Sequence, residues 1–285
     1  MFTLLLTVAL SSNPSAAPSQ LTAPAISLFA QDPEGKKEGM DEDKSDEEKL
    51  DPKKVEAAVE ALKEAFEKGS EVADRLEAIE AALAYPHEDI AKAMAKGLKD
   101  KEHEVVLTTI VALARLKHPA AMKELVNAYK RERAIKKDDV LFAATLKSIG
   151  SYGDPDNIDL LSDDLFQNTS KNVIRARIFG LGKTRSVEAA KELMTIMSSS
   201  GHKYVNPHMD EINLSLSILT GADEGKSRNR WVTWWNANKR TLKITEEPQE
   251  IDRKSQSKWD QYWDLEPKKK DERKKKDKRE KPDEE

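Results

Sequence analysis

A helical hairpin that repeats every 32–36 residues constrains the fold of this chain more than any other feature. The turns before the second helix of each hairpin fall in register at Pro86, Pro119, Pro155 and Val187. A leucine follows six residues beyond the last three of these positions, at Leu125, Leu161 and Leu193. A repeat of this period is typical of helical solenoids, in which each unit buries its apolar face against its neighbours. We therefore expect an α-solenoid, a fold that serves binding far more often than catalysis.

Apolar residues recur at helical spacing along the whole middle of the chain, which indicates an all-α protein. Residues 242–245 form at most one short extended segment, and the sequence contains no longer alternation of the kind that a sheet requires. The clearest helices are expected within residues 55–69, 105–116, 140–152, 158–166, 173–181, 187–197 and 212–219.

Charge is distributed very unevenly and divides the chain into segments. Residues 31–52 hold ten Asp and Glu against four Lys, whereas residues 268–281 hold ten Lys and Arg against four Asp and Glu. Neither stretch has apolar periodicity, so both are expected to be disordered. The expected organisation is a signal peptide, an acidic linker, a solenoid, a linker with an aromatic amphipathic segment and a Lys-rich tail, at residues 1–30, 31–52, 53–245, 246–267 and 268–285.

The N-terminus begins with a short apolar run over residues 2–10, which is too short to span a bilayer but suits the central region of a signal peptide. Small residues follow it, as signal cleavage requires. The first Lys or Arg is Lys36, so the positive N-terminal region is weak, and a disordered apolar start is the alternative. We expect export to the periplasm, the cell envelope or the medium, with no transmembrane segment left after cleavage.

The hairpins resemble the short HEAT-like repeats of bacterial proteins over residues 70–240. The shared motif is a turn followed by Pro-x-x-apolar-x-x-Leu, as in Pro119 to Leu125 and Pro155 to Leu161. Tetratricopeptide and ankyrin repeats have a similar period, but their signature residues are missing here. The resemblance implies a right-handed α-solenoid of HEAT-like helical hairpins.

The last unit carries a more specific pattern, in which Leu219-Thr220-Gly221 ends one helix and a Trp-x-x-Trp-Trp helix follows. This unit looks like the closing unit of exported bacterial HEAT-repeat proteins. Trp231, Trp234 and Trp235 share one helix face. We expect them to cover the apolar end of the solenoid, with an aromatic binding platform as the alternative.

Beyond a polar link, Trp259, Tyr262 and Trp263 repeat the same spacing. This second aromatic segment is expected either to dock back on the solenoid or to bind a partner as an amphipathic helix.

A binding surface is expected on the second helices, which line the concave side in HEAT-like proteins. The exposed positions there change sign along the chain, which suits a protein partner of mixed charge better than a polyanion. The alternative is an ordinary solvated helix face. The candidate partner-binding residues are Lys92, Lys96, Lys123, Asn127, Lys130, Asp159, Asp163, Lys191 and Thr195, together with Trp259, Tyr262 and Trp263.

Motifs that would indicate chemistry fail on inspection, so we expect no enzyme, no cofactor and no metal. Gly182-Lys183-Thr184 lacks the earlier glycine and the strand of a P-loop. The chain has no cysteine, and His202 and His208 lie across Pro207 without the helical spacing of metal ligands.

The expected function is a non-enzymatic scaffold that binds a protein partner. The first alternative is binding of nucleic acid or an anionic envelope polymer through the basic Trp helix and the Lys-rich tail, which combine cations with aromatic rings. The second alternative comes from the resemblance alone, because HEAT-like repeats also occur in bilin lyases.

Overall fold

The computed structural model describes residues 50–67, 71–163, 170–199, 206–247 and 249–265. The expected signal peptide, nearly all of the acidic linker and the Lys-rich tail lie outside these residues. Within them the chain forms thirteen α-helices and two 3-10 helices and no strand. The all-α prediction is therefore confirmed, and residues 242–245 form no strand.

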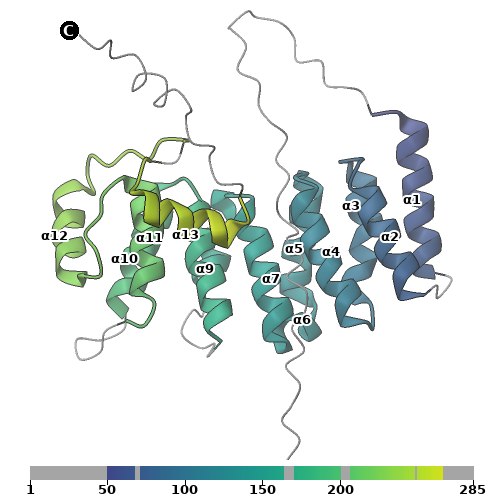
Figure 1. Ribbon diagram of the computed structural model, residues 1–285, viewed down its shortest axis with the longest axis horizontal. Coiled ribbons are helices and arrows are strands. Elements are labelled where there is room, and N and C mark those ends of the chain that lie inside the picture. The colour runs from purple at the N-terminus through teal and green to yellow at the C-terminus, as the bar shows by residue number, and fades with distance from the viewer. Residues whose placement is uncertain (1–49, 68–70, 164–169, 200–205, 248, 266–285) are drawn as a thin grey trace, which may run out of the picture.

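Most helices of the described residues fall into two rows, and Figure 1 shows the helices of both rows side by side between α1 and α12. The first-helix row packs in the order α2, α4, α7, α9 and α11. These helices span Val72–Ala82, His103–Arg115, Asp139–Ser151, Lys171–Lys183 and Met209–Thr220. Consecutive members of this row contact one another, so these helices follow one another in space as they do in sequence.

The second-helix row contains α1, α3 with the 3-10 helix η1, α5, α8, α10 and α12. These elements span Pro52–Glu67, Glu88–Met94, Ala95–Lys99, Pro119–Arg131, Ile158–Ser162, Val187–Ser199 and Arg228–Asn238. Here α1 packs on α3, α3 on α5, α8 on α10 and α10 on α12. The helix expected within residues 55–69 is thus α1, which precedes the first hairpin and extends this row by one member.

A continuous apolar core runs between the two rows from Val55 to Trp231. The three leucines in register, Leu125, Leu161 and Leu193, are each fully buried in it. Their common burial gives the sequence repeat its physical basis, because the same position of α5, α8 and α10 points into the core.

The turns between the helices of a hairpin repeat in detail. Lys117 and Gly153 both adopt left-handed backbone angles, with φ of 51° and 64°. The next residue caps the second helix in each case, because the side chains of His118 and Asp154 accept a hydrogen bond from the backbone N–H two residues on. In the first hairpin His87 is the cap, so Pro86 comes one residue before the cap, whereas Pro119 and Pro155 each come one residue after it.

The first-helix row contains two unusually close helix contacts. Gly150 of α7 faces Gly180 of α9 so closely that a Cβ atom on Gly150 would lie 2.6 Å from the Gly180 Cα. Two residues further, on the opposite side of α9, a Cβ atom on Gly182 would lie 2.6 Å from the Cβ of Ser215 in α11. Glycine is required here because of space rather than because of an unusual backbone angle.

An arginine lies inside the core close to these contacts. Arg177 is 3% exposed, and its guanidinium donates a hydrogen bond of 2.6 Å to the carbonyl of Leu160, in the last turn of α8. The carbonyls at a helix C-terminus have no partner within the helix. Arg177 therefore caps α8 from the neighbouring helix α9, and its charge also lies 5.6 Å from the ring centroid of Phe142.

Two short elements were not predicted. The helix α6 (Arg133–Lys137) is only five residues long and is anchored by one buried side chain, Ile135, so it has no periodicity to detect. The 3-10 helix η2 (Pro155–Asn157) begins the second helix of its hairpin, and the described part of α8 ends at Ser162.

Candidate functional site

The nine candidate residues of the second helices all lie in the second-helix row. Lys92 and Lys96 lie on α3 and η1, and Lys123, Asn127 and Lys130 lie on α5. Asp159 and Asp163 belong to α8 and its end, and Lys191 and Thr195 to α10. All nine are exposed except Asn127, which is half-buried. The structure therefore leaves this whole row of polar side chains accessible to a partner.

The N-terminal end of this row contains an open groove of about 630 Å³ between α1 and α3. Its apolar lining comes from Leu50, Pro52, Val55, Val59 and Ala93. Its charged and polar lining comes from Glu56, Lys63, His87, Asp89, Lys92 and Lys96. The structure thus brings two of the candidate residues, Lys92 and Lys96, to the edge of an apolar hollow. We call this hollow the α1–α3 groove.

The two candidate lysines at the edge of the α1–α3 groove each form an ion pair with a nearby glutamate. The Lys92 ammonium lies 2.6 Å from a Glu88 carboxylate oxygen, and the Lys96 ammonium lies 2.6 Å from a Glu67 carboxylate oxygen. The hydrogen bond from Lys92 lowers the pKa of the Glu88 carboxyl, and the bond from Lys96 lowers that of Glu67. A groove with paired charges at its edge and apolar side chains on its floor suits a partner that inserts apolar side chains.

Further along the row, exposed charges of like sign lie on the same helix, with cations on α5 and carboxylates on α8 and its end. Lys123 and Lys130 have no ion-pair partner among the described residues, and the same holds for Asp159 and Asp163. The predicted change of sign along the second helices is therefore present on the accessible face of the protein, where it can select a partner by complementary charge.

The second aromatic segment is docked on the protein itself. Trp259 and Trp263 of α13 (Arg253–Trp263) are 3% and 4% exposed and pack with Phe179, Leu214 and Ile218. Figure 1 shows α13 lying across α11 and α9. Trp259 and Trp263 therefore do not form an exposed partner-binding surface, which corrects their place among the candidate residues.

Tyr262, the third aromatic side chain of α13, is half-buried between cations and Phe179. Its ring centroid lies 4.1 Å from that of Phe179, and Lys147 lies 5.0 Å above the Tyr262 ring. Lys147 also binds Asp264 at 2.8 Å. Docking is further supported by Arg185, which donates hydrogen bonds to the carbonyls of Thr245 and Glu247 in the link before α13.

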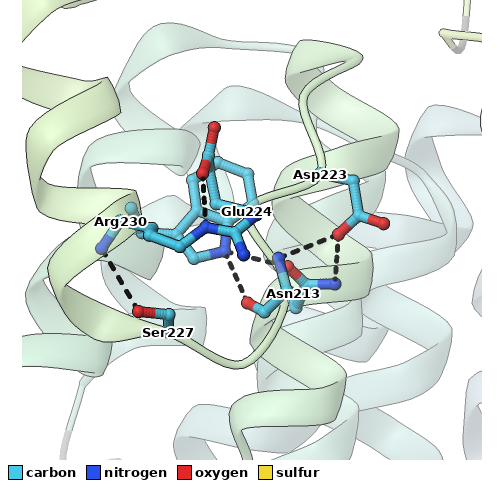
Figure 2. Close-up of polar contacts among 7 residues, drawn as sticks. Asn213, Asp223, Glu224, Ser227 and Arg230 are labelled. Carbon is cyan, nitrogen blue, oxygen red and sulfur yellow. Dashed lines mark hydrogen bonds and ion pairs between the residues drawn. The ribbon is translucent and has the colours of Figure 1, made fainter.

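The first Trp cluster closes the end of the core. Trp231 is fully buried, and its indole N–H donates to Asn213 Oδ1 at 2.8 Å and to the Gly225 carbonyl at 3.0 Å. Figure 2 shows the polar side chains gathered there. The Asn213 side-chain amide donates a hydrogen bond to Asp223, and the Arg230 guanidinium donates one to Glu224. Trp234 and Trp235 are partly buried against the same core. This burial matches the expected cap and makes Trp231 inaccessible for stacking on a ligand.

The motifs rejected from the sequence are structural in the protein. Gly182 packs on Ser215, and the Thr184 hydroxyl donates back to the Gly180 carbonyl within α9. In the part of the chain that the structure describes, no three His, Cys, Asp or Glu side chains gather as metal ligands would. Nor does any described helix have the length and apolar character to span a membrane.

His208 is buried at the start of α11, with 6% of its surface exposed, and burial lowers its pKa below the ordinary value. The nearby Glu211 carboxylate, 3.9 Å from Nδ1, opposes this shift, and the positive charges of Lys171 and Arg175 add to it. The neutral imidazole is therefore the form that the fold prefers. His202, the other histidine of the rejected metal site, lies outside the described residues.

The lowered pKa of His208 predicts how stability depends on pH. Because the unfolded chain takes up this proton at a higher pH than the folded protein, the stability is complete above about pH 6.5 and falls as the pH drops below it. The loss is less than about 1.4 kcal/mol per pH unit, the limit for one proton. Urea unfolding between about pH 7.5 and 5.5 measures it. His208→Gln should flatten this dependence, and an unchanged slope in that variant would contradict the assignment.

The comparisons with known proteins assign no relative. No protein-family model matches the chain, and a search of curated proteins found no significant match. The candidate site therefore depends on geometry alone.

Sequence reasoning located the second-helix row but missed the α1–α3 groove. The groove arises because Val59 of α1 and Ala93 of α3 belong to helices separated by a complete first helix. The available signal was the apolar spacing of Val55 and Val59 in a helix that precedes the first complete hairpin.

Proposed function

We propose that this chain is a right-handed α-solenoid of HEAT-like hairpins and acts as an exported, non-enzymatic scaffold that binds a protein partner along its second-helix row. The observation that carries the proposal is the α1–α3 groove, which places an apolar hollow at the end of an accessible row of polar side chains. The order of helix contacts supports the solenoid, because each first helix packs on the next.

The α1–α3 groove suits an amphipathic helix or an extended segment as its occupant. One leucine-sized side chain buried on Val55, Val59 and Ala93 would contribute about 1.5–3 kcal/mol to binding. The remaining face of the row, with Lys123 and Lys130 followed by Asp159 and Asp163, would then fix the direction of the partner by charge. Affinity and specificity would thus come from different parts of the same row.

The nucleic-acid alternative depends on cations combined with accessible aromatic rings. With Trp231, Trp259 and Trp263 buried, this alternative retains mainly charge. Binding of that kind would weaken steeply as salt increases, whereas binding in an apolar groove would change little. A salt titration of the isolated complex therefore separates the two functions.

Site-specific photo-crosslinking in the native host tests the proposal. A photoreactive residue at Lys92, Lys123 or Lys191 should capture one and the same protein, since all three positions lie on the proposed face. The same residue at Glu104 of α4 or Asn172 of α9, both exposed in the first-helix row, is the matched control and should not capture it.

A substitution that fills the α1–α3 groove makes the test specific. Val59→Trp places a large side chain in the hollow and should abolish capture from Lys92, while Val232→Trp, at another half-buried valine far from the groove, should preserve it. Equal capture from both rows, or capture that survives Val59→Trp, would rule out the groove as the anchor.

A further inference from the structure

A second surface of a different kind lies where α5 bends into α6. Five cations occur there within eight residues, and all of them are exposed: Lys130, Arg131, Arg133, Lys136 and Lys137. We call this group the basic edge. The one carboxylate within it is Glu132, which lies 3.5 Å from the Lys99 ammonium of η1. The basic edge therefore keeps an excess of positive charge that faces solvent.

The stability of the two helices explains only part of this excess. Cations near a helix C-terminus interact favourably with the helix dipole, which accounts for Lys130, Arg131, Lys136 and Lys137. Arg133, however, lies in the first turn of α6, where a cation is unfavourable. None of Arg131, Arg133 and Lys137 has a carboxylate within ion-pair distance among the described residues. Such a locally unfavourable choice is expected at a functional surface.

The fold holds the basic edge in place. Ile135 is 1% exposed and anchors α6, and the Lys136 ammonium lies 4.3 Å above the ring of Tyr129. The next residue after α6, Asp138, caps α7 by accepting hydrogen bonds from the backbone N–H groups of Val140 and Leu141. The cations therefore project from a fixed support, which lowers the entropic cost of binding.

An exposed apolar side chain lies beside the basic edge. Val140, in the first turn of α7, is 53% exposed, and among the described residues it is the one large apolar side chain in the exposed class. Two carboxylates lie next to Val140 in the sequence. The Asp138 carboxylate already accepts the cap hydrogen bonds and lies 3.2 Å from His103 Nε2. The Asp139 side chain is exposed. Cations and one exposed apolar group thus lie within residues 130–140, where α6 packs on α7.

We propose that the basic edge and Val140 bind an acidic segment of a partner protein, whose carboxylates face Arg131, Arg133 and Lys137 and whose apolar side chain covers Val140. A long polyanion fits less well, because the chain carries a net charge of −4 and Asp139 lies within the surface. This surface shares Lys130 with the second-helix row, but the three cations that carry the inference lie outside the candidate residues of that row and outside the α1–α3 groove. The inference therefore goes beyond the proposed function, and its test does not require a partner in the groove.

Fluorescence anisotropy of the full chain with a short labelled peptide, EDELEDDE, tests the inference at about 50 mM salt. Removing three cations by Arg131→Ser, Arg133→Ser and Lys137→Ser should weaken binding by at least about tenfold. The matched control removes three exposed cations of α13, by Arg253→Ser, Lys254→Ser and Lys258→Ser. It changes the net charge equally and should alter the Kd by less than about twofold.

Val140 is tested by a double-mutant cycle with the peptide EDESEDDE, in which serine replaces leucine. The leucine should improve binding to the native chain by about threefold to tenfold and have no effect on a Val140→Ser variant. Equal weakening by both triple variants would overturn the proposal, because binding would then follow net charge. Tighter binding of a short duplex DNA than of the peptide, lost with the same three cations, would also overturn it.

Discussion

Alanine at Gly150 should lower the free energy of unfolding by about 2–3 kcal/mol, although alanine favours helices over glycine by about 1 kcal/mol. The reason is the contact between α7 and α9, in which the new Cβ would lie 2.6 Å from the Gly180 Cα. Backbone atoms cannot rotate away as a side chain can, so the two helices must separate. Urea unfolding followed by circular dichroism measures the change.

A second glycine provides the matched comparison for Gly150. Alanine at Gly182 would meet the Cβ and Oγ atoms of Ser215, each at 2.6 Å. Because these are side-chain atoms, Ser215→Gly should recover part of the loss caused by Gly182→Ala. No substitution of a facing side chain should rescue Gly150→Ala. An unchanged or higher midpoint for Gly150→Ala would show that α7 and α9 are further apart than described.

Alanine at Trp231 should cost about 3–5 kcal/mol, the largest loss that we expect from a single truncation. The indole is fully buried, and its removal leaves a cavity as well as two acceptors, Asn213 Oδ1 and the Gly225 carbonyl, without their donor. The end of the core would then be open to water at α11. The same unfolding experiment measures this loss.

Two further substitutions distinguish a cap from a binding platform. Trp231→Phe keeps most of the apolar surface and removes the N–H, so it should cost about 1–3 kcal/mol. Trp234→Ala removes a partly exposed ring and should cost less than Trp231→Ala. If Trp231→Ala left the stability unchanged, the tryptophan would not be a cap, and a role in ligand binding would have to be reconsidered.

The sequence predicted the parts of the fold that repeat. Leu125, Leu161 and Leu193 are buried as their register indicated, and α10 begins at Val187 where the turn was expected. The helix α6 escaped prediction because one buried side chain, Ile135, gives no period. The docking of α13 was one of two expectations, since spacing alone could not show whether Phe179 and Leu214 would be available to cover Trp259.

The candidate site was predictable to a smaller extent. The exposed positions of the second helices follow from helical spacing, and Lys92, Lys123 and Lys191 are found on one row. The α1–α3 groove and the basic edge depend instead on contacts between elements. The pairs Lys96 with Glu67 and Lys99 with Glu132 join residues about thirty positions apart, and they determine which charges remain available.

Hydrogen–deuterium exchange of the protein with and without its captured partner distinguishes the two rows of helices, because it reports each helix separately. We expect the partner to slow exchange in α1, α3 and α5, around the α1–α3 groove, and to leave exchange in α4 and α9 unchanged. Protection confined to α4, α7 and α9, with α1 and α3 unaffected, would contradict the claim that the second-helix row is the binding face.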